Sequence, residues 1–123
     1  MSPKVSIIIP TYNRADLLPR AINSVLNQTF QDFELIIVDD GSTDNTKQVV
    51  EEFQKKDKRI KYIWQENSGL PTSRNTGIEN TQGEYIALLD DDDVWLNKKL
   101  EIQLNKIEKN NHELFFSNWY FWD

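Results

Sequence analysis

The sequence contains no cysteine among its 123 residues. This absence excludes disulfides, zinc–thiolate sites and a thiol nucleophile, and it fits a reducing compartment. Positive charge is also scarce, because 14 Lys and Arg stand against 20 Asp and Glu, which gives a formal charge of −6. Nucleic acids and anionic membranes are bound by clustered Lys and Arg, so we expect no nucleic-acid partner. A phosphorylated ligand remains compatible with this charge if a divalent cation mediates its contact.

Long apolar runs and the common nucleotide-loop motifs are missing as well. No stretch has the length of a membrane-spanning helix, and the residues after Met1 do not form a signal region with a cleavage site. Neither a GxxxxGK(S/T) loop nor a GxGxxG loop occurs, so the usual signal of nucleotide hydrolases and dinucleotide enzymes is absent. We therefore expect an intracellular, cytoplasmic domain.

Segments of strand character alternate with segments of helical periodicity along the chain. Runs rich in apolar and β-branched residues predict strands over Val5–Ile9, Phe33–Val38, Ile60–Trp64, Tyr85–Leu89 and Glu113–Phe121. Helices are predicted from an N-cap at Asn13, from a cap at Ser42 or Asp44, from Pro71 in a first turn, and over Leu96–Lys109. This order predicts a single α/β domain with a mostly parallel sheet and helices on both faces.

Polar, loop-forming residues follow three of the predicted strands directly. These stretches are Pro10–Arg14, Asp39–Ser42 and Asp90–Asp93. The carboxyl ends of parallel strands lie along one edge of a sheet, and ligands of open α/β sheets bind in the crevice outside that edge. We therefore expect three stretches that are far apart in sequence to meet at one site.

The run Asp90–Asp93 has two interpretations. Alternate residues of an extended segment point to the same side, so Asp90 and Asp92 can face one ion together, and carboxylate oxygens suit Mg²⁺ or Mn²⁺. Alternatively, Asp93 caps the following helix and the other carboxylates are solvated, since acidic strand-to-helix turns are common. The spacing does not decide between a metal site and a helix cap.

The other polar positions also have ordinary structural interpretations. Asp39 and Asp40 can shape a tight turn, which the residues taken alone favour, or accept hydrogen bonds from a nucleobase or ribose. Tyr12 can stack on a base or pack against the sheet. Arg74 can bind a phosphate or form a surface salt bridge.

Six motifs in this order and spacing resemble glycosyltransferases of family 2, which have the GT-A fold. They are Val5–Arg14, Gln28–Phe30, Phe33–Asp44, Asn67–Gly69, Ser73–Gly77 and Gly83–Asp93. The resemblance spans nearly the whole chain, and it implies a Rossmann-like GT-A nucleotide-sugar-binding domain over residues 1–123. It further implies an inverting, metal-dependent transfer from a nucleotide-diphosphate sugar, foremost a UDP-sugar, to an acceptor hydroxyl in polysaccharide or glycan synthesis.

The resemblance also assigns roles by position at the nucleoside end. Pro10, Thr11 and Tyr12 would line the nucleoside pocket, with Tyr12 near the base. Asp40 would bond uracil, and Asp39 would support the turn.

At the diphosphate end, Asp90–Asp92 matches the acidic metal motif of the family. Asp91 would lie near the ribose or donor sugar, and Asp92 would contact Mn²⁺ or Mg²⁺ together with Asp90. Arg74 would approach the donor site, and Arg14 belongs to the same substrate-binding set.

The catalytic base stays unassigned. An inverting enzyme needs a base that takes the acceptor's proton, and in the family this carboxylate comes from a segment after the donor half. Asp123 is a terminal residue and is poorly positioned for such work. We expect a fragment of a longer protein, whose glycan acceptor site lies elsewhere and which can be peripheral to the inner face of the membrane. The alternative is a nucleotide-sugar-binding module without turnover.

Overall fold

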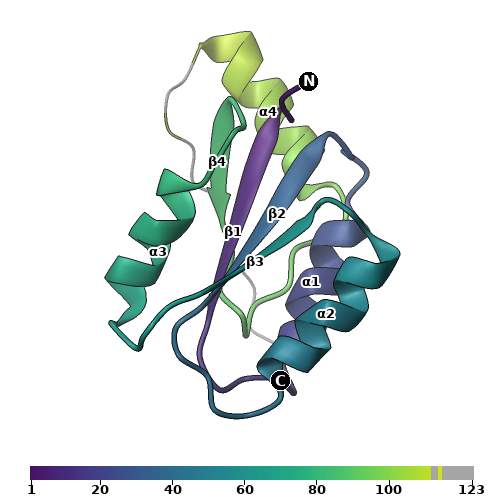
Figure 1. Ribbon diagram of the computed structural model, residues 1–123. Helices are drawn as coiled ribbons and strands as arrows, with labels where there is room; N and C mark the ends of the chain where they lie inside the picture. The colour runs from purple at the N-terminus through teal and green to yellow at the C-terminus, as the bar shows by residue number, and fades with distance from the viewer. Residues whose placement is uncertain (112–113, 115–123) are drawn as a thin grey trace.

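The computed structural model describes residues 1–111 and 114, in which strands and helices alternate (Figure 1). The elements are β1 Val5–Thr11, α1 Leu18–Leu26, β2 Phe33–Asp39, α2 Thr46–Lys56, β3 Ile60–Trp64, α3 Leu70–Glu79, β4 Tyr85–Leu88 and α4 Lys99–Asn110. The predicted α/β class is confirmed, and the first four predicted strands agree with β1–β4 to within two residues. The predicted strand Glu113–Phe121 lies outside the described residues.

The four strands form one sheet in the order β3-β2-β1-β4, and every pairing is parallel. All residues of β1 and β2 are buried, as their nearly continuous apolar sequences predict for central parallel strands. In this arrangement the carboxyl ends of the strands share one edge. The loops that follow β1, β2 and β4 therefore begin side by side.

Helices cover both faces of the sheet, which confirms the predicted layering. On one face α1, α2 and α4 pack on Ile7, Ile9 and Leu35, and on the other face α3 covers Ile8 and Ile36 (Figure 1). The helices are 9 to 12 residues long, and none of them in the described part of the chain is long and apolar enough to cross a membrane.

Two predicted helix caps are wrong. Helix α1 begins at Leu18 rather than next to Asn13, and its cap residue makes no side-chain hydrogen bond. Helix α4 begins at Lys99, so Asp93 does not cap it. The physical reason is that both polar residues lie in loops that turn toward the carboxyl edge before their helices start.

The predicted start of α2 is one residue out, and that of α3 is confirmed. The N-cap position of α2 is Asn45, not Ser42 or Asp44, although the Asp44 carboxylate accepts a hydrogen bond from the N–H of Thr46, the first residue of α2, at 3.0 Å. Pro71 lies in the first turn of α3, where its missing N–H costs nothing.

Candidate functional site

The loops after β1, β2 and β4 meet at the carboxyl edge of the sheet. Thr11, the last residue of β1, pairs with Asp39 at the end of β2. The Thr11 carbonyl accepts a hydrogen bond from the N–H of Asp40 at 2.9 Å, and the Thr11 hydroxyl donates to Asp91 Oδ2 at 2.9 Å. Thr11 thus joins the three stretches, as the predicted parallel order requires.

The four residues Asp90–Asp93, here named the acidic run, face two directions. Asp91 is 7% exposed and is directed toward Thr11 and Arg14. Asp90, Asp92 and Asp93 each place one carboxylate oxygen within 4.8 Å of the others. Asp90 and Asp92, predicted to point to the same side, therefore lie close together, and Asp93 lies with them.

These three carboxylates fit a hard divalent cation. Mg²⁺ and Mn²⁺ take carboxylate oxygens and complete their coordination with water and phosphate oxygens. Burial, together with the charges of the other three aspartates, raises the pKa of Asp93 above its ordinary value. Burial also raises the pKa of Asp91, although Thr11 and Arg14 oppose that rise. A bound cation would relieve this repulsion.

Two arginines balance part of this negative charge. Arg14 Nη1 lies 3.2 Å from Asp91 Oδ1 and 2.9 Å from Asp92 Oδ2. Arg74 Nη2 lies 3.0 Å from Asp90 Oδ1. Arg74 Nε is buried and has no hydrogen-bond partner among the described residues. The salt bridge that the sequence allowed for Arg74 is present, and its partner belongs to the acidic run.

Asp39 and Asp40 shape the nucleoside side of the edge. Asp39 accepts hydrogen bonds from the N–H of Ser42 at 2.8 Å and from the hydroxyl of Tyr62. It therefore holds the turn after β2, where Gly41 has a φ of 84° and a Cβ would lie 2.8 Å from the N atom of Asn67. These contacts agree with the turn-shaping role predicted for Asp39.

The Asp40 carboxylate binds the loop Gln65–Gly69, for which the sequence predicts no role at the site. Its Oδ1 accepts from Gln65 Nε2 and from the N–H of Ser68, both at 2.8 Å, and its Oδ2 accepts from the N–H of Gly69 at 2.9 Å. Burial raises the pKa of Asp40, but these donors outweigh it, so the pKa lies below the usual value. The Ser73 side chain, which also stabilises the ionised form, lies beside the carboxylate. No local pattern announces Gln65, whose role depends on a contact across 25 positions.

The predicted nucleoside-lining residues differ in exposure. Pro10 is buried inside β1 opposite Val38, and Thr11 is 3% exposed. Tyr12 is 48% exposed, so its interpretation as a core-packing residue is wrong. Its ring is accessible at the edge of the sheet.

Asn13 positions the loop that carries Tyr12 and Arg14. Its Oδ1 accepts hydrogen bonds from the N–H groups of Thr43 and Asp44 at 2.7 and 3.3 Å, and its own N–H donates to Ser42 Oγ at 2.9 Å. Its φ is 50°, a conformation that asparagine tolerates better than most residues. The local sequence around Asn13 predicts a helix cap and does not indicate this function.

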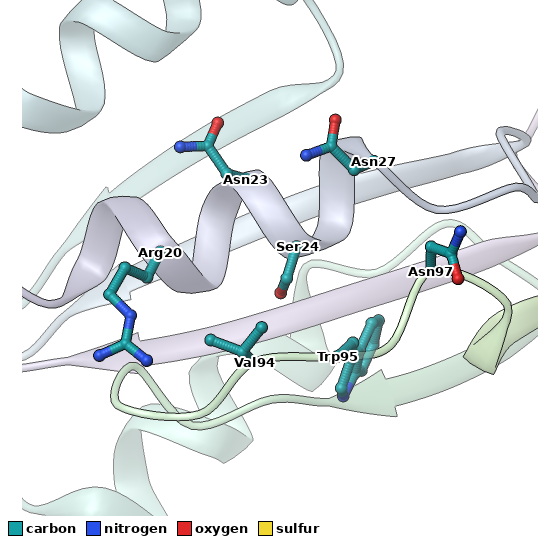
Figure 2. Close-up of a pocket in the computed structure, with 7 residues that line it drawn as sticks. All are labelled: Arg20, Asn23, Ser24, Asn27, Val94, Trp95 and Asn97. Carbon is teal, nitrogen blue, oxygen red and sulfur yellow. The ribbon is translucent and has the colours of Figure 1, made fainter. Parts of the chain in front are cut away.

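A separate hollow of about 530 Å³ lies between α1 and the segment that follows the acidic run. It is lined by Arg20, Asn23, Ser24 and Asn27 on one side and by Val94, Trp95 and Asn97 on the other. Figure 2 shows Arg20 and Ser24 pointing from α1 toward Val94. None of the predicted site residues lines this hollow, so it is distinct from the carboxyl-edge site.

Comparison with known proteins agrees with this geometry. A sequence profile described as "Glycosyl transferase family 2" matches residues 6–123. A Campylobacter jejuni protein named GalNAc(5)-diNAcBac-PP-undecaprenol beta-1,3-glucosyltransferase is 43% identical over 115 residues, which are 92% of this chain and 37% of that protein. The first relatives matched are longer still, because the chain spans 16% of one and 18% of two others.

Solved structures show the same fold. S. aureus TarS 1-349 in complex with UDP-GlcNAc superposes with a TM-score of 0.82 at 34% identity, over 88% of this chain and 32% of TarS. The mannosyltransferase PcManGT from Pyrobaculum calidifontis, in complex with GDP-Man and Mn²⁺, gives a TM-score of 0.71 at 27% identity, over 77% of this chain and 29% of that one. The predicted GT-A fold is confirmed, and the chain belongs to glycosyltransferase family 2.

Proposed function

We propose that the chain is the nucleotide-sugar-binding domain of an inverting glycosyltransferase. The reaction would transfer a sugar from a nucleotide-diphosphate sugar, foremost a UDP-sugar, to an acceptor hydroxyl in polysaccharide or glycan synthesis. The observation that carries the proposal is the meeting of three loops on one edge, which combines an exposed aromatic ring, an ionised carboxylate and the acidic run. The ligands named for the solved relatives, UDP-GlcNAc and GDP-Man, support it.

The proposed domain comprises residues 1–123 of a longer protein. Its support is the length of the relatives, since the chain spans 37% of the Campylobacter protein and 49% of a Haemophilus influenzae protein. The acceptor site and the catalytic base would then belong to the remainder of such a protein.

The nucleoside would bind beside β1 and β2. Tyr12 offers an exposed ring on which a base can stack, and Asp40 Oδ2 can accept an N–H from the base. Because Asp40 is held by donors from the Gln65–Gly69 loop, the orientation of its carboxylate is fixed. Pro10 and Thr11, which are buried at the end of β1, would form the floor of the pocket.

The diphosphate would bind over the acidic run. Asp92 and Asp90, with Asp93, would hold Mn²⁺ or Mg²⁺, which neutralises charge on a leaving nucleotide diphosphate. The Thr11 hydroxyl holds the Asp91 carboxylate toward β1. In this position Asp91 can accept a hydrogen bond from a hydroxyl of the ribose or of the donor sugar. Arg14 and Arg74 lie beside these carboxylates and can donate to phosphate oxygens.

The acceptor and its location are further parts of the proposal. The Campylobacter relative is named for a glycan linked to undecaprenol through a diphosphate. This supports a glycan acceptor for the longer protein and a place at the cytoplasmic face of the membrane, to which the protein would bind peripherally.

Calorimetric titration of UDP with and without Mn²⁺ tests the proposal. We expect binding that Mn²⁺ strengthens and that Asp92→Asn weakens about tenfold or more, because the substitution removes one charged ligand of the cation. Asp32→Asn removes the same charge from the loop before β2, at the opposite edge, and should leave binding unchanged. Absence of metal-enhanced binding of UDP, GDP and dTDP alike would contradict the proposal.

A second candidate is a nucleotide-sugar-binding module without turnover. The short span of the chain relative to the matched proteins favours it. Incubation with UDP-sugars and candidate acceptors separates the two functions, since product formed by the isolated chain excludes a pure binding module.

A further inference from the structure

Arg14 makes an ion pair that the proposed donor binding leaves unexplained. Its Nη1 lies 2.9 Å from Asp92 Oδ2 and 3.2 Å from Asp91 Oδ1. Asp92 belongs to the trio of carboxylates whose oxygens lie within 4.8 Å of one another. A protein cation therefore already neutralises a carboxylate that a divalent cation would use.

Two cations next to Asp92 would repel each other. A guanidinium is always charged, and a divalent ion held by the same carboxylate would bring further positive charge close to it. Solvent moderates this repulsion, because the Arg14 and Asp92 side chains are 46% and 49% exposed, but it does not abolish it at such short range. Binding of a divalent ion alone would therefore work against the Arg14–Asp92 pair.

The Arg14 side chain can leave while its backbone stays in place. The side chain is 46% exposed, and no other side chain of the described residues pairs with it besides Asp91 and Asp92. The neighbouring backbone is fixed through Asn13, which is hydrogen-bonded to Ser42 and Thr43. The exchange needs only a rotation of the side chain.

We propose that Arg14 is an exchangeable counter-ion of the acidic run. In the free protein it neutralises Asp91 and Asp92 and competes with the divalent cation. When cation and nucleotide diphosphate enter together, its donor fork moves to the phosphate oxygens. The cation then binds weakly alone and tightly with the nucleotide, which makes the two ligands mutually dependent. This inference rests on the proposed function, since it takes the acidic run as a cation site.

The test is a Mn²⁺ titration without nucleotide, in which the electron paramagnetic resonance signal of free Mn²⁺ measures how much of the ion remains unbound. Arg14→Met should bind Mn²⁺ roughly two- to fivefold more tightly than the wild type, the range expected for loss of a partly exposed ion pair. Arg14→Lys keeps the charge and should stay near the wild type. At saturating Mn²⁺, Arg14→Met should bind UDP several-fold more weakly, because a phosphate donor is lost.

Lys58→Met is the matched control. It also removes one positive charge, but Lys58 lies in the turn between α2 and β3, at the opposite edge of the sheet. Its Mn²⁺ affinity should equal that of the wild type. If Lys58→Met tightens Mn²⁺ binding as much as Arg14→Met does, net charge explains the effect and the exchange is wrong.

The remaining outcomes separate this inference from the function on which it rests. If the wild type binds Mn²⁺ with UDP, but Arg14→Met binds Mn²⁺ alone no better than the wild type does, only the exchange is overturned. The exchange is also overturned if neither the wild type nor Arg14→Met binds Mn²⁺ before UDP is added. If the wild type binds neither ligand under any condition, the proposed function fails as well. Circular dichroism verifies folding, and Arg14→Gln replaces Arg14→Met if that variant does not fold.

Discussion

At the scale of single residues, Glu34 shows how a buried charge is kept ionised away from the proposed site. It lies in β2, is 4% exposed, and accepts hydrogen bonds from Ser6 Oγ at 2.6 Å, Lys61 Nζ at 2.6 Å and the N–H of Gln82 at 2.7 Å. Burial raises the pKa of Glu34, but these donors outweigh it, so the pKa lies below the usual value. Glu34 thereby ties the segment before β4 to the centre of the sheet.

Glu34→Gln should lower the free energy of unfolding at pH 7 by about 1–3 kcal/mol, because buried donors lose their charged acceptor. The pKa of Glu34 is lower in the folded than in the unfolded state, where it is about 4.3, so its contribution is complete above that value. The contribution is lost as the pH falls through the folded-state pKa. Urea unfolding of both proteins at pH 7 and in acid checks this, and the difference between them should shrink in acid.

Glu52→Gln is the control for this experiment. It removes an exposed partner of Lys55 and should change the unfolding midpoint little at either pH. A difference between the wild type and Glu34→Gln that stays constant down to the acid transition would contradict an ionised role for Glu34.

At the scale of elements, the strands were predictable and the starts of two helices were not. Runs such as Val5–Ile9 have one interpretation, because a central parallel strand is buried on both faces. Asn13 and Asp93 look like helix caps by local preference. Asn13 is instead held by the distant residues Thr43 and Asp44. The N–H of Asp93 donates to the carbonyl of Asp90 in a turn before the helix. Periodicity does not record such contacts.

The packing of α3 on β1 gives a prediction at this scale. A Cβ on Gly77 would lie 2.5 Å from Cγ2 of Ile8, a side chain with no exposed surface. Gly77→Ala should therefore destabilise the fold by about 1–3 kcal/mol, although alanine favours helix by about 1 kcal/mol. Urea unfolding measures the change, and Glu79→Ala, at an exposed position of the same helix, should be nearly neutral.

A double variant makes the cause explicit. Ile8→Ala removes the atoms that the new methyl group would meet, so Gly77→Ala should cost less in that background than in the wild type. Strictly additive free energies in this cycle would show that Gly77 is required for another reason.

At the scale of the whole molecule, the sequence predicts the meeting of the three polar stretches because parallel topology alone requires it. It does not predict the partners within the site. Asp40 is bound by Gln65 and Ser68, and Arg14 by Asp91, contacts that span 25 to 77 positions and depend on how the loops settle against one another. The topology was therefore accessible from the sequence, whereas the division of roles among the acidic residues needed coordinates.

This edge holds six aspartates, Asp39, Asp40 and the acidic run, which outnumber the arginines Arg14 and Arg74 beside them. A ligand that binds only the folded state stabilises it, so Mn²⁺ at about ten times its dissociation constant should add about 1.4 kcal/mol. For a domain of 123 residues that is roughly 5 °C in the midpoint of thermal unfolding. NaCl at equal ionic strength only screens the repulsion and should raise the midpoint less.

Asp92→Asn distinguishes specific binding from screening. The Mn²⁺-dependent shift should disappear in this variant and persist in Asp32→Asn, while the NaCl shift stays similar in both. Mn²⁺ and UDP together should stabilise the wild type more than the sum of their separate shifts, because each completes the binding site of the other. Tryptophan fluorescence during heating measures all these midpoints. Equal shifts from Mn²⁺ and NaCl would mean that the acidic run is only a charged surface.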